Sequence, residues 1–209
     1  MSFETLAVPR ARFSVEDPWT APADCEPVRL RSATNGEVPR LATSVAVWHD
    51  GECLSILFSG ADDRIVATYL EHDQPLWEED VVEVFLAPER ITEYYELEVN
   101  PKGTTFDARI ESPAGERSSM RTDLGWTCEG LVAAVRTVVE SSGAITFDVL
   151  VRFPFASVGR APLPGEIWRA NFFRIDRHPL GDEFSAWQPT MKQPADFHVP
   201  AVFGTLRFG

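Results

Sequence analysis

Residues 145–151 have the sequence ITFDVLV, in which apolar and polar side chains largely alternate. Ile145, Phe147, Val149 and Val151 fall on one side of an extended chain, as in a strand with one buried face. Residues 94–100, YYELEVN, alternate in the same way. β-branched and aromatic residues, which suit a pleated surface, dominate both stretches. Similar short patterns occur at residues 43–48, 55–58, 80–86, 131–138 and 169–176.

Turn-forming residues separate these patterns. Asp50-Gly51 lies between two of them and is typical of a β-hairpin turn. Residues 100–103 (NPKG) and 140–143 (ESSG) have the same character. No long stretch shows helical periodicity. Short strands at this spacing predict an all-β protein, an antiparallel β-sandwich of jelly-roll or immunoglobulin-like type with little helix. We expect this domain over residues 26–209, preceded by an extended N-terminal arm at residues 1–25.

The charge of the chain restricts its partners. It carries 19 basic and 32 acidic residues, a net charge of −13. Such a surface repels phosphate backbones and anionic lipid headgroups, so we expect no nucleic acid and no membrane as partner. A neutral ligand or a cation suits this charge. The N-terminal residues lack the pattern of a secretory signal peptide. The expected location is therefore cytoplasmic, or secreted or periplasmic if a leader has been removed.

Motifs for nucleotide binding, zinc proteases and serine hydrolases are absent from the sequence. The four histidines are scattered without metal-ligand spacing. Cys25, Cys53 and Cys128 form neither a zinc pattern nor a disulfide framework, so we expect reduced thiols. These absences predict that the protein uses no organic cofactor.

Acidic residues gather in the segment at residues 78–83. They are Glu78, Glu79, Asp80 and Glu83. Two carboxyl groups of this cluster could flank and hydrolyse a glycosidic bond. Several carboxylate oxygens could instead hold a structural Ca²⁺ ion. A third interpretation is a charged, solvated loop and strand face. Further along, Glu96 and Glu98 alternate with apolar residues, and we expect them on a solvent face.

Two of the six tryptophans lie in polar loops that contain proline, Trp77 in residues 73–80 and Trp187 in residues 183–190. An indole face can stack on the C–H face of a pyranose while neighbouring amides and carboxylates bind its hydroxyl groups. Burial of about 100 Å² per indole contributes roughly 2–3 kcal/mol. After the costs of association, two such rings predict a micromolar to millimolar Kd.

Residues 76–86, LWEEDVVEVFL, resemble the W-x-x-D-x-x-E-x-F segment of family 9 carbohydrate-binding modules. Residues 95–103 resemble the strand and turn that follow in that family. Three later stretches, at residues 168–176, 186–190 and 197–204, resemble stand-alone family-9-like proteins. The resemblance covers most of the chain from residue 27 onward.

This resemblance implies a β-sandwich related to the DOMON superfamily, with bound calcium. It also implies that Trp77 and Trp187 hold a terminal sugar between them, and that Glu83 binds its hydroxyl groups. Arg109 is a further candidate by position, whereas Asn171 and Gln188 are candidates by proximity to Trp187. The candidate ligand-binding residues are therefore Trp77, Trp187, Glu83, Arg109, Asn171 and Gln188.

The leading prediction is a non-catalytic protein that binds a mono- or oligosaccharide or the end of a glycan chain. Two alternatives of other classes stay open at the level of sequence. A sandwich edge or an apolar patch could dock a partner protein, which would make the chain an interaction or scaffold domain. The acidic segment Glu78–Glu83 could instead make it a glycan-active enzyme. The sequence does not indicate an oligomeric state.

Overall fold

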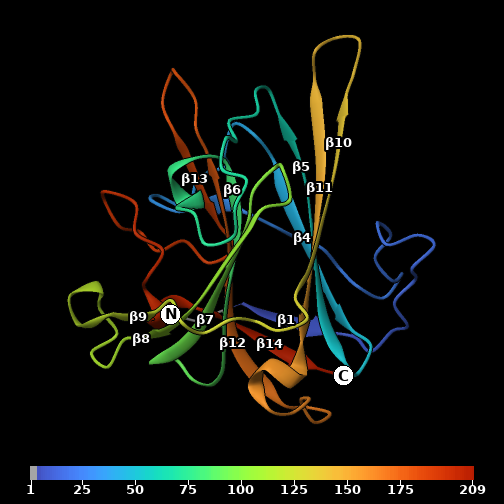
Figure 1. The fold of residues 1–209 in the computed structure, drawn as a ribbon, viewed down its shortest axis with the longest axis vertical. Coiled ribbons are helices and arrows are strands. Elements are labelled where there is room, and N and C mark those ends of the chain that lie inside the picture. Colours follow the sequence, from blue (N-terminus) through green and yellow to red (C-terminus); the bar gives the residue numbers. More distant parts are fainter. Residues whose placement is uncertain (1–3) are drawn as a thin grey trace.

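The structure is a computed structural model that describes residues 4–209. Two β-sheets lie face to face and form a sandwich, seen nearly edge-on in Figure 1. The larger sheet has nine strands and the smaller has five. Except for one parallel pair, the strand pairings of residues 4–209 are antiparallel. The prediction of an all-β antiparallel sandwich is confirmed.

The larger sheet follows the order β1-β14-β12-β6-β7-β8-β9, and β13 and β3 continue it beside β12. Its strands are β1 (Thr5–Val8), β3 (Arg31–Ser32), β6 (Val81–Arg90), β7 (Glu93–Val99), β8 (Thr105–Glu111), β9 (Arg121–Asp123), β12 (Ile167–Asp176), β13 (Glu183–Ala186) and β14 (Gly204–Phe208).

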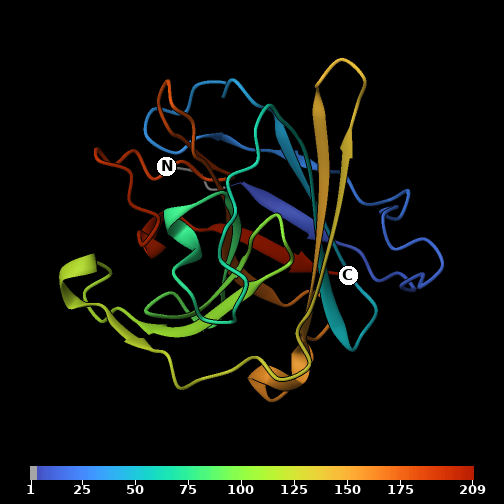
Figure 2. The same cartoon turned by 45° about the horizontal axis from the view of Figure 1, so that its top comes forward.

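The smaller sheet follows the order β10-β11-β5-β4-β2. Its strands are β2 (Val28–Arg29), β4 (Thr43–His49), β5 (Cys53–Asp62), β10 (Val132–Val139) and β11 (Ile145–Pro154). The predicted hairpin turn at Asp50-Gly51 joins β4 and β5, and Gly51 has φ +97°, a conformation that glycine adopts freely. The β10–β11 hairpin extends beyond the body of the sandwich in both views (Figures 1 and 2).

The helical turns of residues 4–209 are short 3-10 helices. They are η1 (Leu76–Glu78), η2 (Arg117–Ser119), η3 (Phe155–Val158) and η4 (Pro200–Val202). Within this part of the chain, no helix is long and apolar enough to span a lipid bilayer.

The core lies between the two sheets, where the strand periodicity directs alternate side chains. Val84 of β6 and Phe172 of β12 face Phe58 of β5 and Val149 of β11 in one continuous apolar cluster. The opposite face of the larger sheet carries a second cluster, which includes Phe85, Tyr94 and Phe173. The outer face of a sheet is usually exposed to solvent. Here the C-terminal loops cover much of that face with apolar side chains such as Phe197.

The stretch predicted as an extended arm has a mixed structure. Thr5–Val8 form β1, which pairs in parallel with β14, and Leu6 and Val8 are buried in the core. The residues that follow run over the outer face of the smaller sheet, where Phe13 and Trp19 pack near Trp48. The sandwich therefore takes in part of the stretch expected as an arm. The first three residues of that stretch lie outside the described residues.

Candidate functional site

Trp187 is buried, with 2% of its surface exposed. Its ring stacks on Phe172 at a centroid distance of 5.4 Å and an interplanar angle of 26°. The indole Nε1 donates a hydrogen bond to Glu4 at 3.0 Å. The backbone of Gly204 lies so close that a Cβ atom there would be 2.4 Å from the ring. The prediction that Trp187 stacks on a sugar is wrong, because the start of β14 covers the indole.

Asn171 and Gln188 belong to the same structural region. Asn171 is fully buried, and its side-chain amide donates to the backbone carbonyl of Gln188 at 2.8 Å. Its carbonyl oxygen accepts from the backbone N–H of Gln188 at 2.9 Å. Asn171 thus holds the turn that follows β13, and its prediction as a sugar ligand is wrong. Gln188 is the backbone partner in this contact and does not line the hollow described below.

Arg109 lies elsewhere. It pairs with Tyr95 in the register of β7 and β8, so it shares a sheet face with Tyr95 rather than with Glu96. Its guanidinium forms an ion pair with Glu93 at 2.8 Å. The shallow depression that it lines is separate from Trp77 and Glu83. The structure therefore does not bring Arg109 to the other predicted site residues.

Trp77 and Glu83 do come together. Both line an open hollow of about 830 Å³ on the face of the larger sheet that points away from the smaller sheet. Trp77 lies in η1 and is 42% exposed, whereas the preceding Leu76 is fully buried and anchors the turn. Phe106 of β8 meets the indole edge-to-face at 5.3 Å. This contact holds the ring at the rim while much of its surface faces solvent.

The floor of the hollow consists of strand residues, and its walls come from loops. The floor residues are Glu83 of β6, Glu96 of β7, Phe106 of β8 and Ile175 of β12. The walls include Trp77, Arg177, Phe184, residues 192–198 and parts of the segment from Arg117 to Leu124. In Figures 1 and 2 the yellow-green segment that contains η2 and the red C-terminal loops lie on this side of the larger sheet.

Two guanidinium groups and an imidazole border the hollow. Arg117 pairs with Asp196 at 2.9 Å, and Arg177 pairs with Asp182 at 2.6 Å. Arg177 also donates to the backbone carbonyl of Trp77, while its buried Nε–H finds no acceptor within residues 4–209. His198 contacts the Tyr94 hydroxyl at 2.9 Å. Burial lowers the pKa of His198 to about 4, so this imidazole is neutral at pH 7.

Three carboxyl groups meet at and beneath the floor. Glu83, Glu96 and Glu98 are 2%, 6% and 0% exposed, which corrects the expectation that Glu96 and Glu98 face solvent. Both side chains do point away from the sandwich core, but η1 and the C-terminal loops cover that face. Burial raises the pKa of Glu96 to about 7. Burial and mutual repulsion raise the pKa of Glu83 and of Glu98 well above the ordinary value.

The other acidic residues of the predicted cluster have structural partners. Glu78 accepts a hydrogen bond from the Tyr69 hydroxyl at 2.7 Å, and Glu79 accepts from Thr68. Asp80 is buried and accepts from the backbone N–H groups of Val66 and Arg177. These bonds fix the loop around η1. None of the three carboxyl groups lines the hollow with Trp77.

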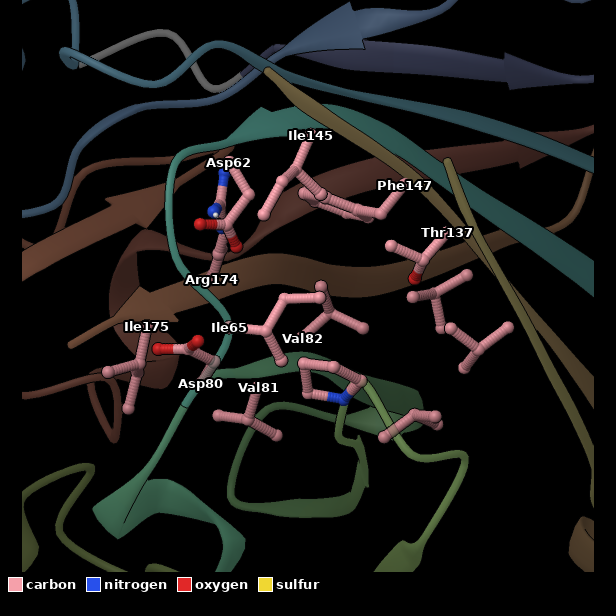
Figure 3. A pocket seen from close by; sticks show the side chains of 14 residues that line it. Asp62, Ile65, Asp80, Val81, Val82, Thr137, Ile145, Phe147, Arg174 and Ile175 are labelled. Carbon is pink, nitrogen blue, oxygen red and sulfur yellow. Dashed lines mark hydrogen bonds and ion pairs between the residues drawn. The ribbon is translucent and has the colours of Figure 1, made fainter. Parts of the chain in front are cut away.

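A second set of buried carboxyl groups lies at one end of the core, namely Asp62, Asp80 and Asp176. Arg174 donates to Asp62 at 3.1 Å and lies 3.4 Å from Asp176, which Arg40 also contacts at 3.0 Å. Figure 3 shows Arg174 beside Asp62 at a neighbouring cavity of about 30 Å³, room for one or two waters. Because guanidinium groups already pair with Asp62 and Asp176, this group is a poor fit for the calcium expected from the resemblance.

Sequence patterns missed most of the walls of the hollow. Arg117, Arg177 and His198 come from loops far apart in the chain, and no local spacing relates them. Glu96 was visible as part of an alternating pattern, but a pattern of period two does not show which face a loop will cover. The segment from Trp77 to Glu83 carries two of the site residues within one motif, and the stretch at residues 197–204 carries Phe197 and His198.

The fold and the hollow define a β-sandwich that presents a ligand-sized concavity on one sheet face, the class of domain that works by binding. The chain belongs to carbohydrate-binding family 9, whose sequence profile matches residues 32–208. An extracellular protein of Arthroderma benhamiae is 22% identical over 204 residues, which span 91% of this chain and 87% of that protein.

Solved structures share the fold at low sequence identity. A candidate carbohydrate-binding protein from Bacteroides uniformis aligns with a TM-score of 0.72 and 20% identity, over 100% of both chains. A family 9 module from Caldicellulosiruptor kristjanssonii in complex with cellotriose aligns with a TM-score of 0.66 and 13% identity, over 98% of this chain and 93% of that one. A structure of such a module with glucose aligns with a TM-score of 0.65 and 13% identity, over 99% and 96%.

Proposed function

We propose that this protein binds the ring of a neutral sugar in the hollow beside Trp77, without catalysis. The observation that carries the proposal is the position of Trp77, whose indole is 42% exposed in the same concavity as Glu83. Family membership supports a carbohydrate ligand, since the related modules from Caldicellulosiruptor kristjanssonii were solved with cellotriose and with glucose. The binding surface has one stacking ring, because Trp187 is buried.

Each part of the hollow suits one part of a sugar. The indole of Trp77 offers an apolar face for the C–H groups of the ring. The guanidinium of Arg177 lines the hollow, is partly exposed, and can donate to a hydroxyl oxygen. Glu83 and Glu96 can accept from hydroxyl groups at the floor. At about 830 Å³ the hollow can hold one or two sugar rings.

The same geometry favours binding over hydrolysis. A glycosidase places its two carboxyl groups on either side of the scissile bond. Glu83 and Glu96 instead lie side by side on neighbouring strands of the floor. With a single indole contributing roughly 2–3 kcal/mol, we expect a Kd toward the millimolar end of the usual range.

The test is a titration with glucose, cellotriose and xylose, followed by calorimetry and by tryptophan fluorescence. Trp77→Ala should weaken binding at least tenfold and leave the melting temperature nearly unchanged, because the ring is partly exposed. Trp19→Ala is the matched control, since Trp19 packs on the outer face of the other sheet and should not alter affinity. Equal affinity in wild type and Trp77→Ala would refute the proposed site. Release of reducing sugar by the wild-type protein would refute the non-catalytic role.

A further inference from the structure

A histidine and two aspartates meet where the loop before η1 lies against the start of β8. His72 and Asp73 belong to that loop, whereas Asp107 belongs to β8. One potential ligand atom from each residue lies within 4.8 Å of the other two. None of the three side chains lines the hollow, so the proposed sugar site does not use them. Their arrangement therefore needs an explanation of its own.

Contacts with Thr105 fix the orientation of the His72 ring. Its Nδ1 lies 2.9 Å from the backbone carbonyl oxygen of Thr105 and 3.0 Å from the hydroxyl oxygen of the same residue. Because a carbonyl oxygen can only accept a hydrogen bond, the contact at 2.9 Å places a proton on Nδ1. The other ring nitrogen, Nε2, then faces the two aspartates. Histidines that bind metal ions have this arrangement, in which one N–H is held by a carbonyl oxygen and the other nitrogen coordinates the ion.

Each aspartate directs one oxygen towards Nε2 of His72. The distance from Nε2 is 3.3 Å to Oδ1 of Asp73 and 3.8 Å to Oδ2 of Asp107. The side chain of Asp107 is only 2% exposed, and its Oδ1 accepts a hydrogen bond from the backbone N–H of Cys128 at 3.2 Å. Its Oδ2 accepts no hydrogen bond from residues 4–209. A buried carboxylate oxygen in this position requires a positive group beside it.

The distances fit a shared metal ion better than a second proton on the ring. A hydrogen bond from a charged N–H to a carboxylate is about 2.7–2.9 Å long, and both distances from Nε2 exceed that range. Tetrahedral ligands at about 2.0–2.1 Å from a zinc ion lie roughly 3.3–3.4 Å from one another. The distance to Asp73 matches this spacing, and a small rotation of the Asp107 carboxylate brings the other distance to it.

We propose that His72, Asp73 and Asp107 bind a divalent transition-metal ion of the zinc type. An imidazole nitrogen combined with carboxylate oxygens suits Zn²⁺, whereas Ca²⁺ prefers oxygen ligands alone. The side chains of His72 and Asp73 are 43% and 38% exposed, so the ion can enter from solvent and a water molecule can be its fourth ligand. The bound ion ties the loop that leads to Trp77 to β8. This proposal does not depend on the proposed sugar.

His178 provides an internal contrast, because it also lies near an aspartate. Its Nε2 is 3.9 Å from Oδ1 of Asp63. The Nδ1 of His178 accepts a hydrogen bond from the backbone N–H of Leu180 at 3.1 Å, so the ring proton is on Nε2. That nitrogen is therefore a donor towards Asp63 and not a metal ligand. The hydrogen bonds of His72 place the proton on the opposite nitrogen and leave Nε2 able to coordinate.

The experiment measures Zn²⁺ binding by calorimetry, without sugar, after EDTA has been added and removed. An excess of Ca²⁺ occupies any site made of oxygen ligands alone. Wild-type protein should bind Zn²⁺ at this site and melt several degrees higher with zinc, because a ligand of the folded state stabilises it. His72→Asn should weaken that binding at least tenfold and remove the gain in melting temperature, since its amide can still donate to Thr105 but supplies no ligand at the position of Nε2. His178→Asn is the matched control and should behave as wild type.

Asp107→Asn tests the same site from the strand. It keeps the side-chain shape and an acceptor for the N–H of Cys128, so without zinc it should melt at or above the wild-type temperature. Its zinc affinity should fall at least tenfold. Nitrogen-15 NMR of the His72 ring gives a direct measurement, in which zinc should shift the Nε2 signal while Nδ1 keeps its proton. Equal zinc affinity in wild type and His72→Asn, or a His72 ring that carries two protons and does not respond to zinc, would overturn the proposal.

Discussion

Trp187 is a core residue, and its removal should cost stability. Trp187→Ala leaves a cavity between Phe172 and the backbone of Gly204 and removes the hydrogen bond to Glu4. Truncation of a buried tryptophan costs about 3–5 kcal/mol, which lowers the melting temperature by on the order of 10 °C in a chain of this size. Thermal unfolding followed by circular dichroism measures this loss. A variant that keeps its melting temperature but no longer binds sugar would contradict the buried position of the ring.

The contrast between Trp77 and Trp187 shows what local sequence can and cannot predict. Both lie in polar loops with a proline nearby, so composition assigns them the same role. Their solvent exposure differs because of contacts with residues far away in the sequence. Gly204 allows the backbone of β14 to lie against Trp187, whereas Phe106 supports Trp77 from one side only. Exposure depends on such long-range packing, and no motif around either tryptophan records it.

Among the elements, the strands were predictable and the loops were not. Alternation in ITFDVLV and YYELEVN identifies β11 and β7, because one buried face enforces period two. The same alternation placed Glu96 and Glu98 on the correct side of β7 but predicted the wrong environment. The cover over that side comes from residues 188–203, which have little regular structure. Periodicity therefore could not predict the site residues that come from loops.

The loop at residues 188–203 should control the shape of the hollow. Phe197 fastens it to the sheet by stacking on Phe173 at 4.2 Å, with an interplanar angle of 13°. Phe197→Ala should loosen residues 192–198 and lower sugar affinity at least tenfold, with a smaller loss of melting temperature than Trp187→Ala. Calorimetry measures the affinity, and limited proteolysis reports the loosened loop.

Leu163→Ala serves as the control for this loop, since Leu163 is 69% exposed and does not line the hollow. It should change neither affinity nor proteolysis. If Phe197→Ala retains full sugar affinity while its loop becomes sensitive to protease, the C-terminal wall takes no part in binding.

At the scale of the whole molecule, the carboxyl groups buried in and beneath the larger sheet should make stability depend on pH. Burial raises the pKa of Glu96 to about 7 and of Asp80 to about 6, so the folded state holds their protons more tightly than the unfolded state does. Their contribution to stability is fully present below their ordinary pKa values and is lost as the pH rises through 6 to 7. His198, with its pKa lowered to about 4, acts in the opposite direction, because its contribution is lost as the pH falls below 6.5.

Above about pH 6.5 the contribution of His198 to the stability of the folded state is nearly constant. The carboxyl groups then determine how stability changes with pH. In EDTA the melting temperature of the wild-type protein should fall between about pH 6.5 and 8, by a few degrees for each kcal/mol lost. Glu96→Gln should flatten that decline, because its amide does not titrate. Thermal melts of wild type and Glu96→Gln across this range measure the effect. A wild-type melting temperature that rises with pH in EDTA would show that the buried carboxyl groups are already neutralised by another group.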